Sequence, residues 1–178
     1  MKRWIGLGVV TLVLAACLHV LIVWLLPHAI TFAFVRGVTK QIGYNAVFAP
    51  PLPTHESRSV VAPSPDLLYA VCVFDVSAGP VRIAARRPQG YWSLSLYDGN
   101  SDNFFRTNDS EIKDDAVELI LTRGPVDAAT RVKYPSATYV QTPRATGVML
   151  SRILVLDPAN MQSERDAQSS VRCGPAAG

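Results

Sequence analysis

The chain has 178 residues, of which 49% are hydrophobic, and it carries 17 lysines and arginines against 14 acidic residues. This length fits one domain with an anchor rather than two full domains. Because Lys2 and Arg3 are the only cations before Arg36, residues 27–178 hold 15 basic and 14 acidic side chains. This near balance predicts no nucleic-acid partner.

The first predicted element is a transmembrane helix. Residues 4–26 contain no lysine, arginine or acidic residue over 23 positions. At about 1.5 Å per residue this stretch makes about 34 Å of helix, enough to cross the hydrocarbon core of a bilayer. Since Lys2 and Arg3 precede it and cations resist translocation, we expect the N-terminus in the cytoplasm. Residues 1–28 are therefore predicted to anchor a periplasmic domain in a bacterial inner membrane.

Two processing alternatives stay open. Residues 14–17 (Leu-Ala-Ala-Cys) match a bacterial lipobox, which would make the chain a lipoprotein acylated on Cys17. A cleaved signal peptide is the second alternative, and it requires a shorter apolar run before a small-residue cleavage site. Residues 18–26 are nearly all apolar and Pro27 follows them, so neither a polar tether nor such a site is present. This pattern favours an intact anchor.

One face of the predicted span carries small and polar residues. Gly8, Thr11, Ala15 and His19 fall on a single helical stripe. Small residues permit close approach of a second helix, and His19 would supply a hydrogen bond in a setting where ionisable groups are costly. The alternative is a neutral imidazole tolerated in a monomeric anchor.

Residues 29–63 are predicted to be a juxtamembrane helix and a connector. Apolar residues recur at every fourth position from Ile30 to Ile42, which predicts a short amphipathic helix over 29–42. Five prolines between residues 46 and 65 predict an extended connector, because proline removes a donor and fixes φ.

Residues 64–178 are predicted to form one β-rich extracytoplasmic domain. From Leu67 onward apolar residues follow a period of two, and Gly-, Pro- and Asp-containing turns separate short runs. The predicted strands are 68–76, 81–86, 91–97, 104–107, 117–122 and 145–156. Gly147 is a candidate bulge, and Asp157-Pro158 is predicted to begin a final helix over 159–171. Short turns imply a mainly β fold, an antiparallel sandwich or barrel.

A set of short motifs links this domain to a known family. Pro65-Asp66 and Tyr69 are followed by Asp-Val-Ser-Ala-Gly-Pro at 75–80, Tyr-Trp-Ser at 91–93 and Leu-Tyr-Asp at 96–98. The pattern resembles the domain of unknown function 1254 family over about residues 60–172. The resemblance implies a β-rich, often exported or membrane-tethered module, and it implies no reaction. Many members also carry a domain of unknown function 1214, so we expect a separate envelope protein to supply that half.

The cysteines allow two interpretations. Cys72 and Cys173 both lie in the domain that we place in an oxidising compartment, where they can form a disulfide. The alternative is a buried thiol at Cys72 and a free thiol at Cys173, because pairing geometry is not encoded in spacing.

No catalytic residue, cofactor or metal site is predicted. Oxygen-bearing residues between Asp98 and Asp109 partly match a calcium-binding loop, but a polar turn between strands explains them more simply. Aromatic and acidic side chains suggest a small-ligand groove; the alternative assigns the inward ones to the core. These groove candidates are Asp66, Tyr69, Asp75, Tyr91, Trp92, Tyr97 and Asp98.

Two functions are consistent with these features. The first is a non-enzymatic, membrane-tethered envelope module that binds a partner protein through its span and a sheet edge. The alternative is a small-ligand-binding or enzymatic domain built around the Tyr/Trp/Asp groove.

Overall fold

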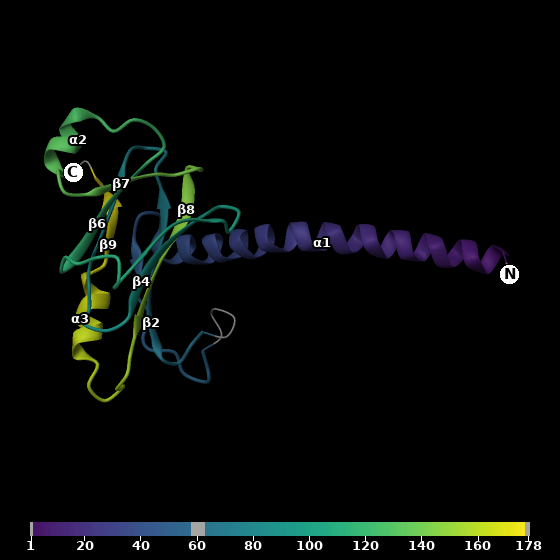
Figure 1. Cartoon of the computed structure of the whole chain (residues 1–178), viewed down its shortest axis with the longest axis horizontal. Coiled ribbons are helices and arrows are strands. Elements are labelled where there is room, and N and C mark those ends of the chain that lie inside the picture. Colours follow the sequence, from purple (N-terminus) through teal and green to yellow (C-terminus); the bar gives the residue numbers. More distant parts are fainter. Residues whose placement is uncertain (1, 58–62, 177–178) are drawn as a thin grey trace.

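The domain is a two-layer β-sandwich from which one long helix projects (Figure 1). The structure is a computed structural model that describes residues 2–57 and 63–176. One sheet has the strand order β1-β2-β8-β4-β5, and the other has the order β7-β6-β3-β9. The prediction of a mainly β fold with an N-terminal apolar helix and a short C-terminal helix is confirmed.

The five-stranded sheet contains the longest strands. Its members are β1 (Val47–Phe48), β2 (Leu67–Asp75), β4 (Trp92–Asp98), β5 (Asn103–Asn108) and β8 (Thr146–Leu154). The four-stranded sheet consists of β3 (Val81–Arg86), β6 (Ala116–Thr122), β7 (Thr138–Gln141) and β9 (Arg172–Pro175). All neighbouring strands are antiparallel except β6 and β7, which pair in parallel.

The core lies between the two sheets because alternate residues of each strand point inward. On β4, Trp92, Leu94 and Leu96 are fully buried, and side chains of β2, β3, β6 and β8 meet them there. The indole Nε1 of Trp92 donates a hydrogen bond to Ser151 Oγ at 3.0 Å, so its polar atom is satisfied inside the core. The period of two seen in the sequence therefore identifies the inward-facing residues of this strand.

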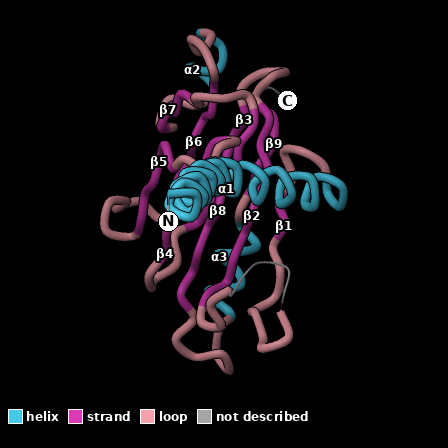
Figure 2. The backbone as a smooth tube through the Cα atoms, turned by 90° about the vertical axis from the view of Figure 1, so that its right-hand side faces the viewer, coloured by secondary structure: helices cyan, strands magenta, loops and turns pink. Residues whose placement is uncertain are grey.

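Helix α1 (Lys2–Ile42) is continuous over 41 residues, and Pro27 lies inside it. The residues 29–42 expected to form a separate juxtamembrane helix are its C-terminal part. Figure 2 looks nearly along the N-terminal part of α1, whereas the C-terminal part runs across β8 and β2 toward β1. Pro27 has no N–H to donate, so the helix lacks one backbone hydrogen bond there.

The C-terminal part of α1 packs on the outer face of the five-stranded sheet. Phe34, Val35 and Val38 contact the apolar cluster formed by Val71, Val73 and Val148. Covering a valine or phenylalanine side chain fully contributes about 1.5–3 kcal/mol, so these turns are a structural part of the sandwich.

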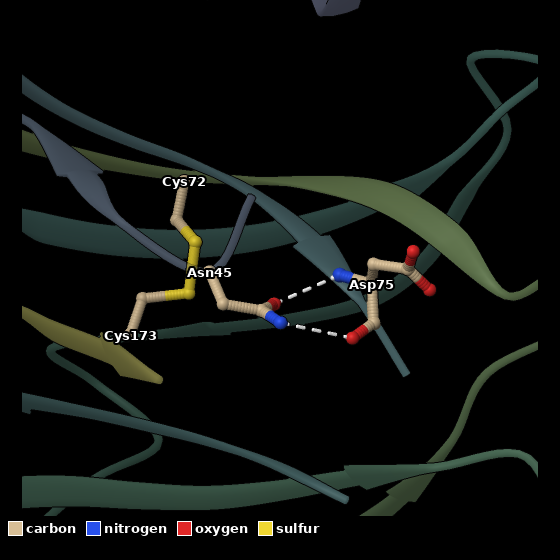
Figure 3. Close-up of a disulfide and its surroundings, with 4 residues drawn as sticks. All are labelled: Asn45, Cys72, Asp75 and Cys173. Atoms are coloured by element: carbon tan, nitrogen blue, oxygen red, sulfur yellow. Dashed lines mark hydrogen bonds between the residues drawn. A yellow bond between two sulfur atoms is a disulfide. The ribbon is translucent and has the colours of Figure 1, made fainter. Parts of the chain in front are cut away.

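The expected connector is partly built into the sheet. β1 pairs with β2, and Asn45 brackets the end of β2: Asp75 N donates to Asn45 Oδ1 at 2.8 Å, and Asn45 Nδ2 donates to Asp75 O at 3.0 Å (Figure 3). Leu52 packs against the core. Residues 58–62 of the expected connector lie outside the described residues.

Cys72 on β2 and Cys173 on β9 form a disulfide that joins the two sheets (Figure 3). Their Cα atoms are 6.4 Å apart, and 101 residues separate them in the sequence. Cys17 is a free, exposed cysteine on α1.

The C-terminal third contains elements that the sequence patterns did not predict. Helix α2 (Ala128–Lys133) begins at Asp127, whose carboxylate accepts hydrogen bonds from Thr130 N at 2.7 Å and Thr130 Oγ1 at 2.9 Å. These bonds, the backbone one foremost, lower the pKa of Asp127.

Helix α3 (Gln162–Ser170) starts later than predicted, because Asp157 instead accepts from Ala159 N in a turn.

Gly147 is not at a bulge, contrary to the sequence-based interpretation. It pairs regularly with Phe74 on β2 and with Asp98 on β4, and the register shift lies instead between Leu96 and Tyr97, opposite β5. A Cβ at position 147 would lie 2.3 Å from Phe74 Cζ and 2.4 Å from the Tyr97 carbonyl oxygen. Glycine is required there because Phe74 on β2 and the backbone of Tyr97 on β4 lie too close to leave room for a side chain.

We predict that Gly147→Ala lowers the free energy of unfolding by about 1–3 kcal/mol, because the added methyl group overpacks the core. The measurement is thermal or urea unfolding of the full chain in detergent. Gly174→Ala on β9 is the matched control, since a Cβ there meets nothing within 4 Å. Equal stabilities of the two variants would contradict the packing described for Gly147.

We also predict that thiol titration of the denatured, unreduced chain finds one reactive cysteine, Cys17, and that reduction raises the count to three. The Cys72→Ala/Cys173→Ala double variant should lower the free energy of unfolding by about 2–5 kcal/mol, as expected for a loop of this length. Cys17→Ala should leave it unchanged. Three reactive thiols before reduction would rule out the disulfide.

Candidate functional site

The seven sequence-predicted groove residues do not meet in one groove. Trp92 is fully buried between the sheets, where no ligand has access to it. Tyr69 and Tyr97 lie on the opposite, outer face of the five-stranded sheet, because their strand neighbours point inward. Tyr97 Oη accepts a hydrogen bond from Arg152 Nη2 at 3.3 Å, and Tyr69 Oη accepts one from Ser64 N at 3.0 Å.

The remaining groove candidates divide between the two ends of the sheet. At one end, Asp66 O accepts from Val155 N, and Tyr91 O accepts from Leu154 N. At the other end, Asp75 and Asp98 are the last residues of β2 and β4. Because β2 has nine residues at about 3.3 Å each, these ends lie about 26 Å apart.

A different site lies where α1 leaves the sandwich. The turn between β4 and β5, together with Arg144 just before β8, faces the helix. Between them lies an open hollow of about 870 Å³. Its polar wall comprises Asn100, Ser101, Asp102 and Arg144, and its helical wall comprises His19, Val20, Val23, Trp24, Pro27 and His28. We call this the α1 groove.

Asp98 organises the polar wall of the α1 groove. Its Oδ1 accepts hydrogen bonds from Asn100 N at 2.7 Å and from Asp102 N at 3.1 Å, which fixes the turn. Its Oδ2 lies 3.3 Å from Arg144 Nε. The Asp98 side chain is 7% exposed and that of Arg144 is 54% exposed, so a buried carboxylate holds a guanidinium that reaches solvent. Ser101 adopts a positive φ of 71° at the turn.

The helical wall combines apolar side chains with two histidines. The rings of Trp24 and His28 lie 5.1 Å apart, and His28 Nδ1 is 2.9 Å from Trp24 O. Just beyond the groove, Thr31 Oγ1 on α1 hydrogen-bonds Ser101 Oγ, and Thr31 is 8% exposed. The turn is thus attached to the helix at one end of the groove.

A second, more polar hollow of about 490 Å³ adjoins the first. Asn100, Asp102 and Arg144 line both hollows, and Arg123 contributes to the second alone. The region therefore places one half-exposed guanidinium between an apolar helix and a polar recess.

The oxygen atoms that resemble a calcium loop do not converge. Asp98 uses its carboxylate on the turn and on Arg144, whereas Asp109 Oδ1 accepts from Trp92 N at the other end of β4. Within residues 2–57 and 63–176, no group of three or more His, Cys, Asp or Glu side chains is placed to hold a metal ion.

The predicted helix-contact face is exposed along α1. Gly8, Thr11 and Ala15 are exposed, and Thr11 Oγ1 donates to Leu7 O within the helix. His19, the last member of this face, lines the α1 groove. Sequence reasoning identified His19 and Asp98 but not Arg144, because an isolated arginine between turns carries no motif.

Comparisons with known proteins agree with the fold and leave its role open. A family model described as "Protein of unknown function (DUF1254)" matches residues 44–175. The VPA0106 protein from Vibrio parahaemolyticus has a similar fold, with a TM-score of 0.62 at 13% identity over 86% of this chain and 36% of that chain. A putative uncharacterized protein from Burkholderia cenocepacia gives a TM-score of 0.48 at 20% identity, over 75% and 37%. The chain spans little more than a third of either protein, and no curated protein matches it.

Proposed function

We propose that this chain, which belongs to the DUF1254 family of proteins of unknown function, is a single-pass protein of the bacterial inner membrane. In this proposal, α1 holds the β-sandwich on the periplasmic surface of the bilayer, and the sandwich binds a partner protein there. The module is non-enzymatic.

The continuity of α1 carries this proposal. The helix is long and apolar enough to cross a membrane, although a signal sequence passes the same test of length and composition. What favours an anchor is that its C-terminal turns are also part of the packed domain, through Phe34, Val35 and Val38. Because its last turns pack on the sheet, α1 is better explained as an uncleaved anchor than as a segment that is removed.

The flanking residues support the orientation. Lys2 and Arg3 precede the apolar segment, and cations concentrate on the cytoplasmic side of single spans. Trp4 and Trp24 lie near the two ends of the segment and are 79% and 63% exposed, as suits indoles at the two membrane interfaces. The disulfide between Cys72 and Cys173 suits an oxidising compartment.

Partner binding is supported by an unpaired sheet edge. Among the described strands, β5 pairs with β4 alone, so one side of its backbone is available to a strand of another chain.

We predict that a C-terminal alkaline phosphatase fusion is active and a C-terminal green fluorescent protein fusion is dark, because the N-terminus stays in the cytoplasm. The control lacks residues 4–26 and should reverse both signals. The mass of the intact chain should show an unacylated, full-length N-terminus, and Cys17→Ala should leave its membrane attachment unchanged. Fluorescence without phosphatase activity would reverse the proposed topology.

We further predict that a photo-crosslinking amino acid at Arg106 on β5 captures a periplasmic protein, whereas the same amino acid at Arg165 on α3 does not. Both positions are exposed on the surface, so the two variants differ only in which region of the surface they probe. Mass spectrometry of the adduct should identify the captured protein. Equal adducts from both positions, or none from Arg106, would argue against edge binding.

A further inference from the structure

The α1 groove lies at the depth of the membrane interface if α1 spans the bilayer as proposed. Val20, Val23 and Trp24 belong to the last two turns of the apolar segment, and the tip of the β4–β5 turn lies beside them. The headgroup layer extends about 5–8 Å beyond the hydrocarbon core on each side of a bilayer. The polar wall of the groove therefore reaches the level of the lipid headgroups.

The two walls of the α1 groove match the two parts of a phospholipid. The helical wall presents Val20, Val23 and the Trp24 indole, which suit an acyl chain and the glycerol region. The opposite wall presents Asn100, Ser101 and Arg144, which supply hydrogen-bond donors at the level of a phosphate. A water-soluble ligand lacks an apolar chain that could cover a helical wall continuing into the bilayer.

The charges in the groove point to the kind of headgroup. Asp98 neutralises part of the Arg144 charge and fixes its guanidinium, which lines both hollows and is half exposed. Asp102 lines both hollows as well and is exposed. Arg123 lines the second hollow but not the α1 groove. Within the α1 groove, an arginine beside an exposed carboxylate complements a phosphate next to an ammonium group, whereas the carboxylate repels a headgroup that carries only negative charge.

From these features we infer that the α1 groove binds one zwitterionic glycerophospholipid of the outer leaflet. Its phosphate pairs with Arg144, its ammonium group lies at Asp102, and an acyl chain follows Val20 and Val23 along α1. This inference rests on the proposed function, since it requires α1 in the bilayer. The bound lipid would fill the space between the sandwich and the span.

The test is native mass spectrometry of the purified full chain in detergent, titrated with phosphatidylethanolamine. The wild-type chain should retain one molecule saturably. Arg144→Gln should weaken retention about tenfold, the loss expected when a charge-assisted contact is removed. Arg165→Gln, the same substitution at a surface position on α3, should retain the lipid as the wild type does. Equal retention by all three proteins overturns the inference.

Because Arg144→Gln leaves Asp98 buried without its partner, the double variant Asp98→Asn/Arg144→Gln provides a second test. The side-chain amide oxygen introduced by Asp98→Asn can still accept from Asn100 N and Asp102 N, so the turn is preserved. This variant should unfold at the wild-type temperature and still lose the lipid. Retention of lipid by the folded double variant overturns the inference, as does equal retention of phosphatidylglycerol by the wild-type chain.

Alkaline carbonate extraction of membranes separates the two proposals. A chain that resists extraction but shows no Arg144-dependent lipid retention keeps the tether and refutes the lipid site. A chain that is extracted, with a truncated N-terminus, refutes the tether and the lipid site together. Wild-type and Arg144→Gln proteins should resist extraction equally, because the span itself is unchanged.

Discussion

The contact between the last turns of α1 and the outer face of the five-stranded sheet determines how the rest of the molecule is arranged. Phe34, Val35 and Val38 shield Val71 and Val73, which would otherwise expose an apolar patch to water. Once this contact is made, the direction of the apolar segment relative to the sandwich is set. The position of the β4–β5 turn beside the helix, and with it the α1 groove, follows from the same contact.

This contact also explains the composition of β2. From Ala70 to Phe74 every residue is buried, since the core covers one face of the strand and α1 covers the other. A strand buried on both faces is expected to be continuously apolar rather than alternating. The edge strand β5 is covered far less and is accordingly polar at both ends. The sequences of β2 and β5 therefore reflect how much of each strand is covered.

Much of the fold could be predicted because it depends on local patterns. The period of two between Trp92 and Leu96, and the turns after Val76 and Tyr97, identify strands without knowledge of their neighbours. The strands that were not predicted depend on partners elsewhere in the sequence: β9 forms because it pairs with β3, and β7 because it pairs with β6. The α1 groove escaped prediction for the same reason. Arg144 acquires its role only from Asp98, 46 positions earlier.

The position of β9 has a consequence for the order in which the domain is assembled. β9 is the last strand among the described residues; it closes the edge of the four-stranded sheet beside β3 and carries Cys173 to Cys72. A chain synthesised from its N-terminus presents β2 and β3 long before β9 emerges. Until then, one edge of β3 lacks its native neighbour and Cys72 lacks its native partner. Completion of this sandwich therefore waits until β9 has been synthesised.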